Sequence, residues 1–332
     1  MRWIALAATL LATPAQAGWK HVDLSTDVTL RAVAVVDAQR FHVSGAKGTH
    51  SVTEDGGKTW RNTIPADGAA LDFRGVAALD AKTAVLMSAG DGPAGLARIY
   101  RTADAGQTWT LVFETREKGS FLDAVAFRDA RRGFVLGDPI DGQWYLLETK
   151  DGGKSWQRKP GPSADPGEAA FAASNSALFL GPGRELWIVT GGLAKGRVAH
   201  SRSDGFQWDS LDSPIVGSPS AGVFGGLALG KDRAIVVGGD YKDELRAGVS
   251  LAIFEQFDIW TPPNEGTPRL LEGVGRLDAK TLIAVGPRGT ALSTDDGQSW
   301  KQVDEQAFHA IACGRGTCVA AGGKGRVAVW VN

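Results

Sequence analysis

The sequence predicts an all-β fold, a β-propeller of seven four-stranded antiparallel blades. An eight-residue motif with Asp, Gly and Trp at fixed places occurs four times along the chain. Tryptophans recur about every 40–50 residues, which is the length of one propeller blade. Glycine is abundant, with 44 of 332 residues, as expected for short strands joined by tight turns. Together these observations favour a repeat protein.

The first 17 residues are typical of an export signal. Arg2 supplies a positive charge, residues 3–13 are apolar, and Ala15-Gln16-Ala17 fits a small-x-small cleavage site. The apolar run is too short to span a bilayer, and no other segment is long and apolar enough. The alternative is a buried N-terminal strand or helix. We predict a signal peptide over 1–17, a single mature domain over 18–332, and a periplasmic or extracellular location.

The repeated motif is Ser/Thr-x-Asp-x-Gly-x-Ser/Thr-Trp, the pattern of the Asp-box or bacterial neuraminidase repeat. Its four copies end at Trp60, Trp109, Trp156 and Trp300. Residues 201–208 are a decayed copy, with Ser203 at the Asp position, and at Trp260 only the Trp remains. With Trp19 and Trp330 at the ends, these anchors delimit seven units.

Each unit is expected to hold four strands, with the box between the third and the fourth. The third unit shows this most clearly, with strands predicted over 121–127, 133–138, 144–149 and 155–160. The last unit, 308–331, offers only three strands, whereas residues 18–24 are a Trp strand with no blade before it. We therefore expect residues 18–24 to complete the last blade and close the ring, which leaves no open edge.

The boxes are predicted to be structural. The carboxylate accepts hydrogen bonds from the backbone of its own turn, and the Trp fills the space between blades. A calcium or catalytic role for the carboxylates is the less favoured alternative. The residues concerned are Asp55, Asp104, Asp151 and Asp295, with Trp60, Trp109, Trp156 and Trp300 expected to be largely buried.

The only two cysteines, Cys313 and Cys318, flank a turn-like Gly-Arg-Gly-Thr sequence. Facing positions of a hairpin bring Cβ atoms close to disulfide range, and an exported protein meets an oxidising compartment. A structural disulfide is favoured over two reduced cysteines.

The charge balance limits the partners. Lys and Arg number 36 and Asp and Glu 37, a net charge of −1, so nothing favours nucleic acid or an anionic membrane surface. No cofactor motif or metal-ligand spacing is present, and we predict no cofactor, no metal and a monomer.

A candidate site follows from aligning the innermost strands by their apolar register. The residue two places before the first buried position is ionisable in six of the seven blades, and these residues should converge on one mouth of the channel. A self-neutralised belt of ion pairs is the competing interpretation. The predicted ring consists of Arg31, Arg74, Asp123, Glu168, Glu272 and His309. Two further carboxylates, Asp138 and Asp240, follow a second strand and a Gly. They either cap a turn or face the opposite mouth of the channel or a surface groove.

The boxes, the period, the export signal and the seven units together resemble the photosystem II assembly and stability factor family. Segments 121–127, 137–142, 236–240 and 325–330 look closer still to bacterial relatives labelled oxidoreductase or glycosyl-hydrolase-like. The resemblance implies a non-catalytic propeller that binds a protein partner through an arginine-lined patch. Because no dense arginine cluster is evident in this sequence, a polar small molecule or glycan remains an alternative ligand.

Sialidases also carry Asp-boxes, but the Arg-Ile-Pro motif expected of them is missing from this sequence. Their chemistry also needs a Tyr–Glu pair, and of the three tyrosines only Tyr241 is placed in a plausible loop. The remaining enzymatic hypothesis is a glycan-active hydrolase using two carboxylates at the channel mouth, such as Asp123 and Glu168. We favour non-catalytic binding because no complete catalytic constellation is evident.

Overall fold

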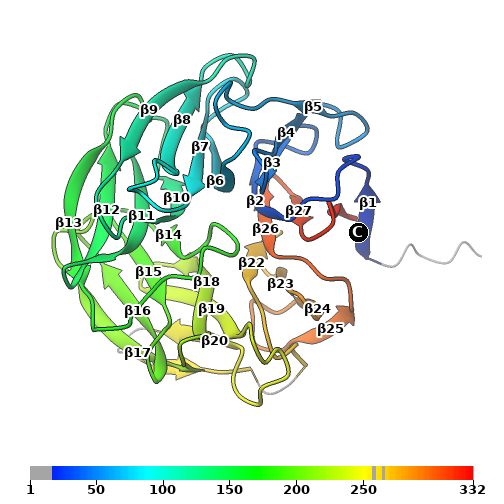
Figure 1. Ribbon diagram of the computed structural model, residues 1–332. Coiled ribbons are helices and arrows are strands. Elements are labelled where there is room, and N and C mark those ends of the chain that lie inside the picture. Colours follow the sequence, from blue (N-terminus) through cyan, green and yellow to red (C-terminus); the bar gives the residue numbers. More distant parts are fainter. Residues whose placement is uncertain (1–16, 256–258, 264–265, 332) are drawn as a thin grey trace, which may run out of the picture.

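The computed structural model describes residues 17–255, 259–263 and 266–331, and the predicted signal peptide lies almost entirely outside these residues. Seven four-stranded antiparallel sheets stand around a central axis as the blades of a propeller (Figure 1). The predicted fold class is therefore confirmed. The described residues contain no helix long and apolar enough to cross a membrane.

The first four blades follow one another in sequence, each running from the inner strand outward. Blade 1 contains β2 (Leu30–Val35), β3 (Phe41–Gly45), β4 (His50–Thr53) and β5 (Arg61–Asn62). Blade 2 contains β6 (Asp72–Ala78), β7 (Ala84–Ala89), β8 (Ala97–Thr102) and β9 (Thr110–Thr115). Blade 3 contains β10 (Leu122–Phe127), β11 (Gly133–Ile140), β12 (Gln143–Thr149) and β13 (Gln157–Ser163). Blade 4 contains β14 (Leu178–Leu180), β15 (Leu186–Thr190), β16 (Lys195–Ser201) and β17 (Asp209–Val216).

The remaining blades close the circle. Blade 5 contains β18 (Ala221–Gly230), β19 (Arg233–Asp240), β20 (Leu251–Glu255) and β21 (Ile259–Thr261). Blade 6 contains β22 (Gly273–Arg276), β23 (Leu282–Gly286), β24 (Gly289–Ser293) and β25 (Lys301–Asp304). Blade 7 contains β26 (Ala310–Gly314), β27 (Thr317–Ala321) and β28 (Val327–Val331), with β1 (Gly18–Val22) as its outermost strand.

The ring is closed as the sequence predicts, because β1 pairs with β28 from Gly18 opposite Val331 to Val22 opposite Val327. Figure 1 shows this dark blue strand beside the red C-terminal strands. In the hairpin of blade 7, Cys313 stands opposite Cys318 and the two are disulfide-bonded.

The core lies between adjacent blades, where the apolar faces of neighbouring sheets pack on each other. Trp144 and Trp187 are almost completely buried there. Of the four box tryptophans expected to be buried, Trp156 and Trp300 are 7% and 6% exposed. Trp60 and Trp109 are only partly buried, which corrects that expectation for blades 1 and 2. Their rings make T-shaped contacts with Phe41 and His50, respectively.

The four box turns share one hydrogen-bond pattern, described here for blade 1. The Thr53 hydroxyl donates to Asp55 (2.9 Å) and accepts from the Gly57 N–H (2.9 Å). Asp55 also accepts from the N–H and the hydroxyl of Thr59, and these bonds lower the pKa of Asp55 to about 2. The carboxylate is thus fully engaged in its own turn. The decayed turn of blade 4 keeps three of these four contacts. The Gly205 N–H donates to the Ser201 hydroxyl, the Gln207 N–H donates to the Ser203 hydroxyl, and the two hydroxyls are 3.3 Å apart.

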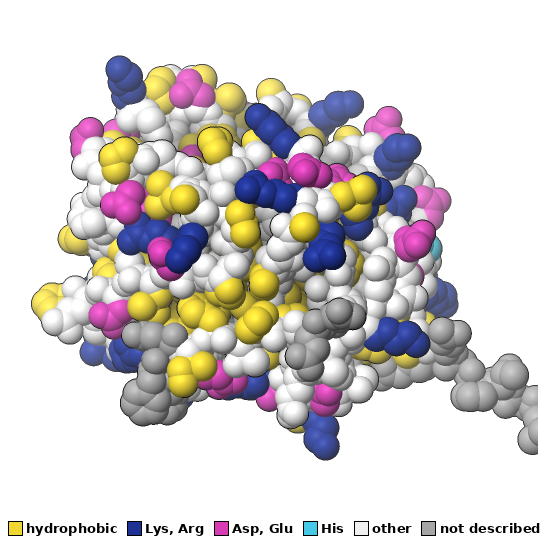
Figure 2. Space-filling model, turned by 90° about the horizontal axis from the view of Figure 1, so that it is seen from below, with side chains coloured by type: hydrophobic (Ala, Val, Ile, Leu, Met, Phe, Trp, Pro, Cys, Tyr) yellow, Lys and Arg dark blue, Asp and Glu magenta, His cyan; other side chains and the backbone are white. Residues whose placement is uncertain are grey.

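The outer rim carries mixed charge. Figure 2 views the ring edge-on, and on this face Lys and Arg side chains are interspersed with Asp and Glu, with hydrophobic side chains gathered below them. Such mixing produces no broad basic surface on this face that would attract nucleic acid.

Candidate functional site

One mouth of the central channel is hollowed into a cavity of about 500 Å³, which we call the mouth cavity. Its ionisable lining residues are Arg31, Arg74, Asp138, Glu244, Glu272 and His309. Its aromatic lining residues are Phe121, Phe171, Phe224 and Tyr241.

Four of the six predicted ring residues line this cavity. Arg31 and Arg74 lie near the start of the inner strands β2 and β6, and Glu272 and His309 directly precede the inner strands β22 and β26. Aligning the inner strands by their apolar positions therefore places these four residues at the channel mouth, as the structure does. Their convergence is a fact of the fold, whereas ligand binding by them stays a prediction.

Irregular strand pairing directs several side chains toward the mouth. The register of β2 shifts between Leu30 and Ala32, at Arg31, and that of β10 shifts between Leu122 and Ala124, at Asp123. A similar shift in β6 contains Arg74, and one in β18 contains Phe224. A β-bulge inserts an extra residue into one strand, which interrupts the alternation of side chains between the two faces of the sheet. Bulges are common beside functional sites.

The segment 164–177, which joins β13 to β14, reaches into the channel as a plug, which the sequence did not predict. The Asn175 side chain accepts from the Val125 N–H (2.8 Å) and donates to Val76 O (3.3 Å), which ties it to blades 3 and 2. Ser174 donates to Glu272 O (2.6 Å) in blade 6. Because Phe171 to Ala173 line the mouth cavity, the plug forms part of its wall.

The prediction for Glu168 is therefore wrong. Its apolar neighbours suggested the inner strand of blade 4, but that strand is β14, which begins only at Leu178. Glu168 belongs to the plug, where its carboxylate accepts from the Thr190 hydroxyl (2.7 Å) and Arg197 (3.2 Å). It is not among the residues that line the mouth cavity, so the carboxylate pair of the hydrolase hypothesis does not face it.

Arg31 is the least compensated charge in the mouth cavity. Burial lowers its pKa, an effect opposed by the nearby Glu272 carboxylate and reinforced by Arg74. Its guanidinium makes no hydrogen bond or ion pair with the described part of the chain within normal distances. Arg74 is fixed by Asp72, to which its Nε donates at 2.7 Å. Two guanidinium groups from adjacent blades thus face the cavity, and one of them has unused donors.

The acidic side of the mouth cavity is unusual in its protonation. Burial raises the pKa of Asp138 to about 6, although the Ala170 N–H donates to it at 3.1 Å. Asp123, 1% exposed and without a hydrogen bond in the described residues, has its pKa raised well above the ordinary range by burial and by Asp138. Asp123 is thus buried beside the cavity rather than part of its lining.

Another part of the cavity lining combines an ionisable pair with an aromatic surface. His309 Nδ1 and Glu272 Oε2 are 2.6 Å apart and satisfy each other. Phe171 of the plug stacks on Phe224 with ring centroids 4.4 Å apart, and Tyr241 meets Phe171 edge-on at 5.8 Å. Such a wall suits an apolar or aromatic group of a ligand. Of the three aromatic residues, the sequence singled out only Tyr241, because they come from segments without a shared pattern.

Asp240 is a turn cap. Its carboxylate accepts from the Lys242 N–H (3.0 Å) and from Arg246 (3.0 Å), and it is not among the lining residues of the mouth cavity. Asp138 therefore lines the same mouth as the predicted ring, not the opposite mouth or a surface groove, whereas Asp240 caps a turn.

No protein-family model and no curated protein sequence matches the chain. Among solved structures, it is similar to YCF48 bound to a D1 peptide, with a TM-score of 0.70 and 18% identity over 97% of this chain and 98% of that one. YCF48 from Cyanidioschyzon merolae gives a TM-score of 0.68 at 13% identity over 94% and 98% of the two chains. The WD40 propeller domain of Doa1 gives 0.64 at 12% identity over 96% and 98%. At such identities the likeness shows that this chain shares the propeller fold of these proteins.

Proposed function

We propose that this chain is an exported, non-catalytic propeller that binds a segment of a protein partner at the mouth cavity. The observation that carries the proposal is Arg31, a partly buried guanidinium with free donors beside Arg74. A buried, unpaired arginine costs free energy that an anionic ligand recovers by charge-assisted hydrogen bonds. The aromatic wall of Phe171, Phe224 and Tyr241 lies in the same cavity and suits an apolar side chain next to the anionic group.

The kind of partner is supported by similarity. The sequence resembles photosystem II assembly factors, and the YCF48 structure with TM-score 0.70 is described as bound to a D1 peptide. We therefore infer a peptide segment carrying a carboxylate as the ligand, with an assembly or stabilisation role as the corresponding function.

Binding is tested by fluorescence anisotropy with a labelled D1 peptide and with a version whose carboxylates are amidated. Arg31→Ala is expected to weaken binding at least about tenfold, since a charge-assisted hydrogen bond contributes on the order of 1.5–3 kcal/mol. Arg131→Ala, which changes an exposed arginine in the turn after β10, is the matched control and should leave the affinity unchanged. Equal affinity of the Arg31 variant, or of the amidated peptide, would contradict the proposal.

Export is part of the proposal and rests on residues 1–17 together with the Cys313–Cys318 disulfide. If the chain is expressed whole in a bacterial host, we expect the purified protein to begin at Gly18. N-terminal sequencing checks this, and an uncleaved Met1 in the purified protein would contradict export by a cleaved signal.

A further inference from the structure

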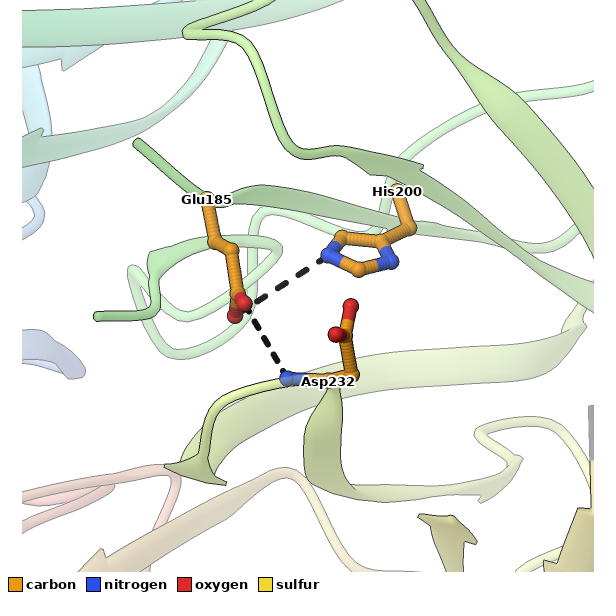
Figure 3. Close-up of side chains that lie close together, drawn as sticks. All are labelled: Glu185, His200 and Asp232. Carbon is orange, nitrogen blue, oxygen red and sulfur yellow. Dashed lines mark hydrogen bonds and ion pairs between the residues drawn. The ribbon is translucent and has the colours of Figure 1, made fainter. Parts of the chain in front are cut away.

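A cluster of three potential ligands lies away from the mouth cavity, where blades 4 and 5 meet. Glu185 directly precedes β15, His200 lies on β16, and Asp232 occupies the turn between β18 and β19. One ligand atom of each lies within 4.8 Å of those of the other two. Figure 3 shows the three side chains pointing toward one another.

Two buried atoms of this cluster have no partner. Glu185 is 3% exposed and His200 1%, and Glu185 Oε2 and His200 Nε2 face each other at 3.9 Å. That distance is too long for a hydrogen bond, and neither atom has a partner in the described chain. A buried polar atom left unsatisfied costs about 1–3 kcal/mol, so the geometry calls for a third group between them.

The donor atoms of the cluster suit a cation. A neutral imidazole with its proton on Nδ1 presents the Nε2 lone pair to the cluster. The carboxylates of Glu185 and Asp232 supply negative charge, and that of Asp232 is shared with Arg202.

The surroundings hold the three side chains in position. The Asp232 N–H donates to the other oxygen of Glu185 at 3.0 Å, and Arg202 donates to Asp232. The His200 ring is stacked on Trp187, with centroids 3.5 Å apart and planes inclined by 10°. Supporting contacts of this kind orient metal ligands.

We propose that Glu185, His200 and Asp232 bind a divalent transition metal, zinc in the first place, which fastens blade 4 to blade 5. Imidazole together with carboxylate is a zinc donor set, whereas calcium and magnesium prefer oxygen alone. In a tetrahedral zinc site with bonds of about 2.0–2.2 Å, the ligand atoms stand roughly 3.4 Å apart. The ligand atoms, which lie within 4.8 Å of one another, would close to this spacing around the ion, and a water molecule would complete the coordination.

The competing occupant is an ordered water molecule bridging Glu185 and His200. The Trp187 indole N–H, also without a partner, could donate to such a water. The two occupants differ in ways that can be measured, because a water does not respond to added metal and gives no ligand-field spectrum.

The test uses the untagged mature protein, stripped with EDTA and titrated with ZnCl2 by calorimetry and thermal unfolding. We expect one zinc per chain and a higher melting temperature in zinc, because a ligand that binds only the folded state stabilises it. CaCl2 should produce no shift. Cobalt loading should give the visible absorption of a four-coordinate N/O site.

Glu185→Gln is expected to weaken zinc binding at least tenfold and to remove the melting shift, with His200→Gln as the second variant. His21→Gln, at an exposed histidine on β1, is the matched control and should bind zinc as the wild type does. If His200→Gln fails to fold, Glu185→Gln decides alone, since it preserves the shape of the side chain. An unchanged melting temperature of the wild type in zinc, or wild-type affinity in Glu185→Gln, would overturn the proposal in favour of a bridging water.

Discussion

Deletion of residues 18–24 is expected to lower the free energy of unfolding by several kcal/mol and to promote self-association. The deletion removes Trp19, whose ring packs on Phe308 at 5.2 Å and on Trp330 at 5.0 Å. Removing a large aromatic side chain from such packing costs about 3–5 kcal/mol. It also exposes the whole edge of β28, and an open edge strand pairs with other chains.

The first strand, β1, also contacts the two neighbouring blades, so its loss removes packing on both sides of blade 7. Val22 lies against Gly57 in the first box turn, where φ is +86° and a Cβ would come within 2.9 Å of the valine. The Trp19 indole N–H donates to the Thr290 hydroxyl (2.8 Å) in blade 6. One strand therefore joins three blades, and urea unfolding of the truncated protein should show a lower midpoint.

A synthetic peptide of residues 18–24, added to the truncated protein, should restore part of the lost stability. An added strand recovers its backbone pairing from a partner edge, and stabilisation rises with peptide concentration. The same peptide with Trp19→Ala is the control and should rescue less. A truncated protein that melts like the full one, or equal rescue by both peptides, would contradict ring closure as the source of stability.

The repeat architecture could be predicted because its information is local. In each box the Ser or Thr, the Asp and the Gly bond to one another within eight residues, so the turn leaves its full pattern in the sequence. The inner-strand positions of Arg31, Arg74, Glu272 and His309 followed from the same regularity. Repeat units can be aligned by their sequence, and equivalent positions in them lie close together once the blades form a closed ring.

The features that the sequence did not predict lie where the chain departs from the repeat. The plug was mistaken for a strand because its short apolar run, 169–173, has the composition of the neighbouring inner strands, while its hydrogen bonds reach blades 2, 3 and 6. The Glu185, His200 and Asp232 cluster was invisible for a similar reason. Its members belong to three segments without ligand spacing and meet only where two blades pack.

Acid is expected to destabilise the protein through a pair of buried histidines in blade 1. His42 Nδ1 and His50 Nε2 are 3.2 Å apart, and the two residues are 1% and 0% exposed. Burial lowers the pKa of His50 to about 4 and that of His42 well below its ordinary value, and Arg61 lowers both further. In the neutral pair, one ring nitrogen donates its proton to the other across this contact. A further proton would place a charge in a buried site, so the folded pair resists protonation.

The direction of the change in stability with pH follows from the number of protons that each state binds. Unfolded histidines take up protons near pH 6.5, whereas folded His50 has a pKa of about 4 and the pKa of His42 is lowered in the same direction. The unfolded state therefore binds more protons below pH 6.5. Stability is then fully present above pH 6.5 and declines as the pH falls below that value. For His50 alone the loss from pH 7 to pH 5 is about 2 kcal/mol, and His42 adds to it. Asp138, with its pKa raised to about 6, opposes the decline by binding a proton in the folded state.

Because other groups titrate in the same range, the measured quantity is the slope of the unfolding free energy with pH, compared between variants. Replacing His42 by Asn should reduce the slope between pH 6 and pH 5 by about 1.4 kcal/mol per pH unit. Asp138→Asn should steepen it, because the opposing proton uptake is removed. Arg131→Ala, at an exposed position in the turn after β10, serves as the control and should leave the slope as in the wild type. If the His42 variant keeps the wild-type slope, the imidazole pair accepts protons in the folded state, and the acid sensitivity arises elsewhere.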